Sequence, residues 1–209
     1  MVKILITGSD GRFGKIFKNI ITKNHLIFRN KRELNILSSS SIQKNLIKYK
    51  PKYILHLAGL SRPMKIHEKN ISKSIDLNII GTSNLVKEAS RLGIKIIYLS
   101  TSYVYPGTKG NYKETDPVKP WNNYSWSKLG GECAVQMYKN SLIIRLCMTE
   151  KPFVHKKAYA NVKLNFIFQE EAAKLILKVI NQKGIINLGG PRDRKSTRLN
   201  SIHRCISYA

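Results

Sequence analysis

The chain has 209 residues, 42% of them hydrophobic, and a formal net charge of +25. This length suits one domain with a substantial core, and no apolar run reaches the roughly 18 residues that a membrane span needs. The charge alone would suit nucleic acid, but the lysines are spread along the chain, so nucleic-acid binding is not expected. Because the first predicted strand begins at residue 3, no signal peptide is expected. The cysteines (Cys133, Cys147, Cys205) have no pairing or metal spacing, which favours a reducing, cytoplasmic setting without a metal site.

Apolar runs alternate with amphipathic segments along the whole chain. Strands are expected near 3–7, 25–29, 53–57, 94–100, 141–146 and 185–188, and helices near 12–23, 39–49, 72–92, 123–139 and 170–182. The serine run 38–41 is predicted to cap a helix, and the pattern between 145 and 169 is irregular. The alternation predicts an α/β fold with a doubly wound parallel sheet, whose ligands bind at the carboxyl ends of the strands.

The first predicted strand runs into a glycine-rich turn, Gly8-Ser9-Asp10-Gly11-Arg12-Phe13-Gly14, and then into a predicted helix. In this context such a motif binds the pyrophosphate of a dinucleotide. Gly8 would allow the tight turn, Gly11 would let backbone N–H groups approach the phosphates, and Gly14 would let the helix pack close to the strand. The alternative is a glycine turn that binds no ligand.

Tyr124 and Lys128 stand four residues apart on a predicted helix and therefore share one face. At ~4 Å and an effective dielectric of ~20, the lysine charge would favour the phenolate by about 4 kcal/mol, which suits proton transfer in carbonyl reduction or alcohol oxidation. Thr101 follows the fourth predicted strand and would face the same site. The alternatives are a surface Tyr and Lys that merely share a face, and a Ser/Thr cluster that only forms a turn.

Three motifs together resemble the extended short-chain dehydrogenase/reductases, most closely the dTDP-4-dehydrorhamnose reductase branch and its nucleotide-sugar relatives. They are Thr-Gly-x-x-Gly-x-x-Gly at 7–14, Ser-Thr-x-Tyr-Val-Tyr at 100–105 and Tyr-x-x-x-Lys at 124–128. The resemblance runs from about residue 1 to residue 191. It implies an NAD(P)-binding Rossmann domain over 1–147, and a partial substrate-binding lobe with late Rossmann elements over 148–192.

The resemblance also implies roles for individual residues. Tyr124 would give a proton to the substrate carbonyl, Lys128 would favour the phenolate and bind the nicotinamide ribose, and Thr101 would hydrogen-bond the substrate oxygen. The residues expected to contact the cofactor are Gly8, Ser9, Asp10, Gly11, Arg12, Phe13, Gly14, Arg29, Asn35, Ile36, Leu57, Ala58, Gly59, Asn78 and Lys128. The histidines His56, His67 and His155 are expected to be structural.

The end of the second predicted strand, residues 26–32, carries three basic residues and no acidic one. NAD-binding proteins usually place an acid there to bind the ribose 2′-hydroxyl. Arg29 is the best candidate to bind a 2′-phosphate, because a guanidinium can make two parallel hydrogen bonds to it. We therefore predict NADPH rather than NADH, the alternative being a solvated basic turn.

The function that the resemblance implies is NADPH-dependent reduction of a keto group on a nucleotide-activated sugar. One alternative is an epimerase or dehydratase of the same superfamily, although Ser102 and Tyr103 stand where dehydratases usually carry an acidic pair. The other alternative is a non-catalytic dinucleotide-binding regulator. Because family members often dimerise through the helix that bears the Tyr–Lys pair, a homodimer is expected.

The last 17 residues are predicted to differ in origin from the rest. The string that begins Asp193-Arg194-Lys195-Ser196 is what one reading frame of a common short-read sequencing adapter encodes. We predict that residues 193–209 are not native and leave them out of the fold. The alternative is a genuine basic tail.

Overall fold

The structure is a computed structural model that describes residues 1–151 and 165–190. Its centre is a parallel sheet of six strands in the order β2-β1-β3-β4-β5-β8. The strands are β1 (Lys3–Thr7), β2 (His25–Arg29), β3 (Tyr53–His56), β4 (Lys95–Thr101), β5 (Ser141–Leu146) and β8 (Gly184–Leu188). The predicted doubly wound α/β fold is confirmed, and each predicted strand matches to within one residue at either end. His155, Cys205 and the tail 193–209 lie outside the described residues.

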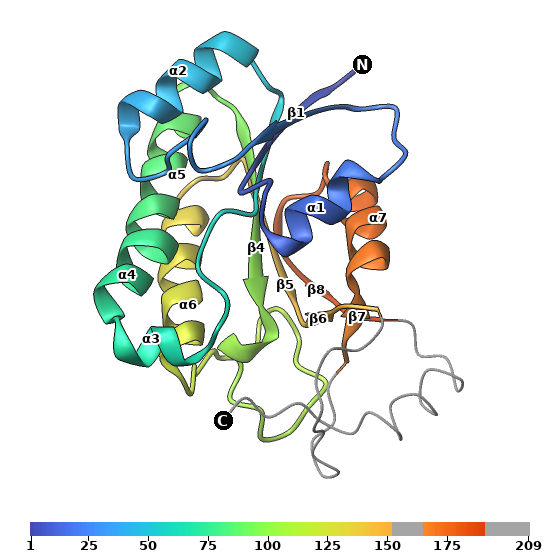
Figure 1. Ribbon diagram of the computed structural model, residues 1–209. Coiled ribbons are helices and arrows are strands. Elements are labelled where there is room, and N and C mark those ends of the chain that lie inside the picture. The colour runs from blue at the N-terminus through green and yellow to red at the C-terminus, as the bar shows by residue number, and fades with distance from the viewer. Residues whose placement is uncertain (152–164, 191–209) are drawn as a thin grey trace.

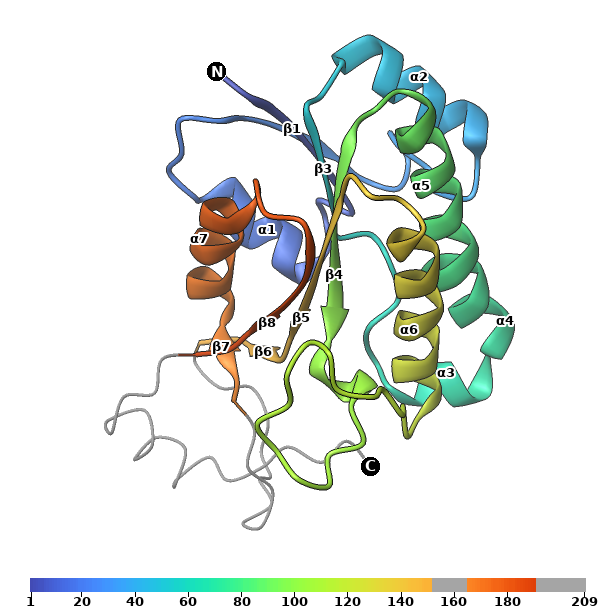
Figure 2. The ribbon, with the colours of Figure 1, turned by 180° about the vertical axis from the view of Figure 1, so that it is seen from behind.

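Helices cover both faces of the sheet (Figures 1 and 2). One face carries α1 (Arg12–Lys18) and α7 (Gln169–Val179), and the other carries α2 (Ser39–Tyr49), α5 (Gly81–Arg91) and α6 (Asn123–Gln136). Because successive residues of a strand point to opposite faces, Ile4 and Ile6 join the core cluster under α1 and α7, whereas Leu5 joins the one under α2 and α5. This two-sided burial explains why the strands are continuous apolar runs.

The predicted helices begin within one residue of their expected starts, but three of them end early. Ser38 accepts a hydrogen bond from the Ser41 amide, which confirms the predicted cap of α2. The helix predicted at 12–23 ends at Lys18, and Ile21, which lies beyond this end, is fully exposed. The helices predicted at 123–139 and 170–182 likewise end three residues early.

The helix predicted at 72–92 is continuous but not uniform. It consists of α4 (Ile71–Ile75), a π-helical turn η1 (Asp76–Ile80) and α5. The elements that were not predicted are too short to show a periodic pattern. They are α3 (Lys65–Lys69), the 3₁₀ turn η2 (Ser102–Val104) and the strand pair β6 (Met148–Thr149) and β7 (Ile167–Phe168).

The strand order places a topological switch point between β1 and β3. From β1 the chain crosses to β2 on one side and returns to β3 on the other, so the loops after β1 and β3 diverge to opposite faces of the sheet. In open α/β sheets this is where ligands bind. In the part of the chain that the structure describes, no helix is long and apolar enough to cross a membrane.

Candidate active site

A cleft opens at the carboxyl ends of β1, β3, β4 and β5. It is lined by the glycine loop, the loop after β3, the end of β4, two residues of α6 and the segment after β5. The predicted site residues that line it are Gly8, Gly11, Arg12, Phe13, Gly14, Leu57, Ala58, Gly59, Thr101, Tyr124 and Lys128. The predicted site residues outside this lining are Ser9, Asp10, Arg29, Asn35, Ile36 and Asn78. The cleft thus unites the three motifs that the sequence places up to 120 residues apart.

The glycine loop is held in a conformation that admits only glycine at two positions. Gly8 has φ +66°, and a Cβ there would lie 2.6 Å from the nitrogen and Cα of Ala58. A Cβ on Gly14 would lie 2.6 Å from the Ser9 carbonyl oxygen. Ser9 is buried and donates its N–H to the Arg29 carbonyl, whereas Asp10 is exposed 3.6 Å from Lys18. Neither residue lines the cleft.

Asn78 joins the loop after β3 to the helix that bears Tyr124. Its side-chain oxygen accepts the Leu60 N–H at 2.7 Å, and its Nδ2 donates to the Leu60 carbonyl and to Ser127 Oγ. A Cβ on Gly59 would lie 2.8 Å from that oxygen. Asn78 sits in the π-helical turn, a distortion that often marks functional sites. The residue is buried in this geometry, so its contact with the loop is structural and its predicted contact with a cofactor stays a prediction.

His56 is the centre of a buried hydrogen-bond chain beneath the cleft. Thr82 donates to the Asn78 carbonyl, so it must accept from His56 Nε2 at 3.1 Å. Thr7 then donates to His56 Nδ1 at 2.9 Å. Burial and, to a lesser degree, the Lys128 charge lower the pKa of His56 to about 3, which keeps the ring neutral. This fits the predicted structural role of His56.

Lys128 lies in an environment that disfavours its protonated, charged form. Its ammonium sits 4.0 Å from the centre of the Tyr98 ring, and the Tyr98 hydroxyl donates to the Lys128 carbonyl at 3.1 Å. Burial lowers the pKa of Lys128 to about 7, against the opposing attraction of Glu132 one helical turn away. The pKa of Lys128 therefore lies near neutral pH, and strongly shifted pKa values are common at functional sites.

Glu132 is itself held by a buried ion pair. Arg145 on β5 donates to both of its carboxylate oxygens, the shortest contact being 2.7 Å, and both side chains are almost fully buried. A further guanidinium nitrogen of Arg145 donates to the Tyr105 hydroxyl at 2.8 Å. Glu132 also attracts the Lys128 ammonium, so its ion pair with Arg145 weakens the electrostatic attraction between Glu132 and Lys128.

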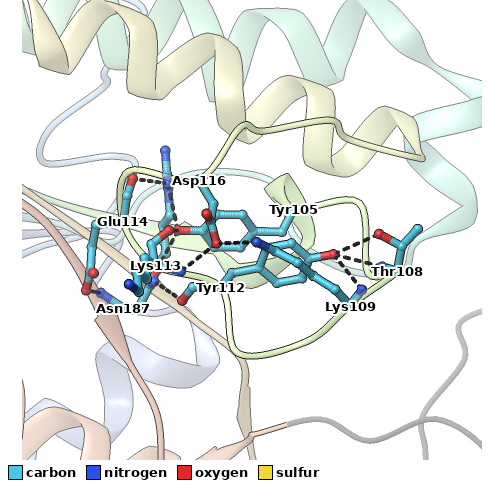
Figure 3. A network of polar contacts seen from close by, with 9 residues as sticks. Tyr105, Thr108, Lys109, Tyr112, Lys113, Glu114, Asp116 and Asn187 are labelled. Carbon is cyan, nitrogen blue, oxygen red and sulfur yellow. Dashed lines mark hydrogen bonds and ion pairs between the residues drawn. The ribbon is translucent and has the colours of Figure 1, made fainter.

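The loop between η2 and α6 is pinned to the edge of the sheet by a polar network (Figure 3). Tyr105 stacks on Tyr112 with ring centres 4.7 Å apart, and its hydroxyl is 2.9 Å from Asn187 Oδ1 on β8. Glu114 accepts the Asn187 N–H at 2.8 Å, and Asp116 pairs with Lys109 at 3.1 Å. The loop that separates Thr101 from Tyr124 is therefore ordered by β8, which is distant in sequence.

The end of β2 lies outside the lining of this cleft. Arg29 bonds Glu33 at 2.8 Å and stacks over the Tyr49 ring, with its guanidinium carbon 4.3 Å from the ring centre. It lines a separate basic pocket beside α2. Asn35 donates its N–H to Ser41 Oγ, and Ile36 is buried against Gly81. The predicted cofactor contacts of Arg29, Asn35 and Ile36 stay predictions.

Three features in or beneath the cleft could not be predicted from the sequence. Tyr98 lies in the middle of an apolar strand, so no signal separates it from a core residue. Arg62 and Glu150 meet across the cleft from loops 88 residues apart, which no local pattern reveals. Cys147 also lines the cleft, but burial raises the pKa of its thiol to about 11, so it stays protonated at neutral pH. Within the described ranges, no group of three or more His, Cys, Asp or Glu side chains could hold a metal ion.

A model of the RmlD substrate binding domain matches residues 2–180. Methionine adenosyltransferase 2 subunit beta from Bos taurus is 34% identical over 142 residues, which are 64% of this chain and 42% of that protein. A dTDP-4-dehydrorhamnose reductase from Aggregatibacter actinomycetemcomitans is 29% identical over 154 residues, 71% of this chain and 52% of that protein. The chain spans about half the length of the curated relatives it matches.

A comparison with solved structures finds the same fold in dTDP-4-dehydrorhamnose reductases. The structure of dTDP-4-dehydrorhamnose reductase from Bacillus anthracis, solved in complex with NADP, superimposes with a TM-score of 0.81 at 20% identity, covering 97% of this chain and 81% of that one. Likeness at this level of identity concerns the fold, and the family match over most of the chain carries the assignment. The chain belongs to the RmlD substrate binding domain family, which confirms the predicted resemblance.

Proposed function

We propose that the protein is an NADPH-dependent reductase of a keto group on a nucleotide-activated sugar. The observation that carries the proposal is that Thr101, Tyr124 and Lys128 line one cleft together with the glycine loop. A proton donor, a titrating ammonium and a dinucleotide-type loop at a topological switch point are what carbonyl reduction needs.

The glycine loop has the donors that a dinucleotide pyrophosphate requires. No side chain caps the first turn of α1, whose N-cap is Gly11, so backbone N–H groups of that turn lack intrahelical partners beside the cleft. Bound in this cleft, NADPH would supply the hydride for the carbonyl carbon. Its preference over NADH is supported by the basic end of β2 and by the NADP found in the Bacillus anthracis relative.

The residues of this chain would perform the proton chemistry. Tyr124 gives its phenolic proton to the carbonyl oxygen as that oxygen gains negative charge, and Lys128 stabilises the phenolate that remains. Thr101 Oγ1 already accepts the Tyr103 N–H at 3.2 Å, so its own proton is available for a hydrogen bond to the substrate oxygen. Acid catalysis of this kind contributes about 10²–10⁴ in rate.

The test is NADPH oxidation with dTDP-4-dehydrorhamnose by the wild type and by Tyr124→Phe. Turnover should fall by about 10²-fold or more in the variant, while the dissociation constant for NADPH stays within about twofold, since only one hydroxyl is lost. Tyr138→Phe is the matched control, because it removes a buried phenol oxygen that has no hydrogen-bond partner in the described structure. Full activity of Tyr124→Phe would refute the role of Tyr124. Turnover without net NADPH consumption would favour the epimerase.

A second function has one observation in its favour. The relative at 34% identity is named as a subunit of methionine adenosyltransferase 2, not as a reductase. A non-catalytic dinucleotide-binding subunit would bind NADPH with the same affinity in the wild type and in Tyr124→Phe, and would oxidise it in neither. This result separates the two functions in the same assay.

The division of the chain is part of the proposal. We assign residues 1–147 to the dinucleotide and 148–192 to a partial substrate lobe, and we expect a homodimer. The strand β8 belongs to the main sheet, which agrees with late Rossmann elements in the second segment. A cross-linking or sedimentation measurement tests the dimer.

A further inference from the structure

Two arginines, one at the start of α1 and one in the loop after β3, contact the same carboxylate at the side of the cleft. Arg12 opens α1, Arg62 lies in the loop after β3, and Glu150 follows β6. Glu150 Oε1 lies 3.6 Å from Arg12 Nη1 and 3.2 Å from Arg62 Nη1, and its Oε2 lies 3.4 Å from the latter. All three line the cleft, and the Arg12 side chain is 52% exposed, so the cluster sits where the cleft meets solvent.

The charges of the cleft favour an anionic ligand. Among the described residues that line it, Arg12, Arg62 and Lys128 are basic, while Glu150 is the one carboxylate. His56 is kept neutral by burial, which lowers its pKa to about 3. One carboxylate between two guanidiniums leaves a net positive charge beside the glycine loop, and a partly exposed ion pair of this kind holds weakly.

We propose that Arg12 and Arg62 form a binding site for a diphosphate group, and that Glu150 occupies the two guanidiniums when no ligand is bound. A diphosphate carries more negative charge than a carboxylate and offers oxygens to two planar guanidiniums at once. Its binding would replace Glu150 and join the glycine loop to the loop after β3. The proposal deepens the proposed function, because it assigns the same cleft a diphosphate ligand. The diphosphate belongs either to the dinucleotide or to the nucleotide-activated sugar.

The first experiment measures the affinity of the 209-residue protein for inorganic pyrophosphate by calorimetry. Arg62→Gln should weaken binding by about tenfold, the scale of one charge-assisted hydrogen bond. Arg62→Lys should fall in between, because it keeps the charge but loses the planar fork. Glu150→Gln should strengthen binding by several fold, because it removes the competing carboxylate. Glu171→Gln, an exposed carboxylate on α7, is the matched control for the loss of one negative charge and should bind as the wild type does.

The second experiment repeats the titrations with NADP⁺ and with dTDP. A loss of affinity in Arg62→Gln for NADP⁺ alone assigns the site to the cofactor, and a loss for dTDP alone assigns it to the substrate. Pyrophosphate affinities of Arg62→Gln and Glu150→Gln that equal the wild-type value, with unchanged thermal unfolding, overturn the proposal. No turnover is read, so failure here is distinguishable from failure of the reductase assay.

Discussion

Lys128 should destabilise the free protein at neutral and acid pH. In the unfolded chain its ammonium holds a proton up to pH 10.5, but in the folded protein burial lowers the pKa to about 7. Between these values the unfolded chain binds one proton more, so stability rises with pH. Below pH ~7 the buried ammonium lowers the free energy of unfolding by about 5 kcal/mol. About 3 kcal/mol of this loss is recovered as the pH rises from ~6 to ~9. Because the side chain is partly exposed, these are upper limits.

The substitution Lys128→Met removes the charge and keeps an apolar stem beside Tyr98. We expect the variant to be more stable than the wild type at pH ~6, with the gain shrinking by up to about 3 kcal/mol by pH ~9. Urea unfolding of both proteins at several pH values measures the difference, and Lys174→Met on the exposed side of α7 controls for losing a lysine charge. A Lys128→Met gain that does not vary with pH would refute the desolvation of Lys128. A gain paired with lost turnover would show a site that trades stability for activity.

Three further predictions concern the support of the cleft. Gly8→Ala should cost about 1–3 kcal/mol in urea unfolding and abolish dinucleotide binding, since its methyl would meet the Ala58 backbone at 2.6 Å. His56→Leu leaves two threonine hydroxyls without their hydrogen-bond partner and should lower the free energy of unfolding by about 2–4 kcal/mol at pH ~7. Because folding lowers the pKa of His56 from 6.5 to about 3, the stability of the wild type should decline as the pH falls from 6.5 toward 3. The variant should not show that decline. Arg145→Met should cost about 3–5 kcal/mol, because Glu132 would stay buried without its cation; a smaller thermal shift than Glu132→Gln produces would contradict this.

The fold was predictable because its signals are local. Strands buried on both faces read as continuous apolar runs, and the glycine loop is required by a positive φ at Gly8. The triad of Thr101, Tyr124 and Lys128 followed from spacing on a helix and from the rule that ligands gather at strand ends. The structure brings these residues to one cleft, and their catalytic roles remain predictions.

The remaining contacts were not predictable because their partners are far apart in the chain. Glu150 meets Arg12 from 138 residues away, and Asn78 bonds Ser127 across 49 residues. Arg29 stands at the end of β2, where its position predicts a phosphate ligand. Its guanidinium contacts Glu33 and the Tyr49 ring, and the phosphate contact stays a prediction.

The hydrogen-bond chain through His56 has a consequence for hydrogen exchange. The amides of Leu57 and Ala58 donate to the hydroxyl of Thr7, not to the backbone of a neighbouring strand. Their exchange rates therefore report the opening of the loop after β3, separately from the unfolding of the sheet. Two amide signals would thus follow the cleft opening and closing in the free protein, and their slowing on addition of a dinucleotide would measure how far a ligand closes it.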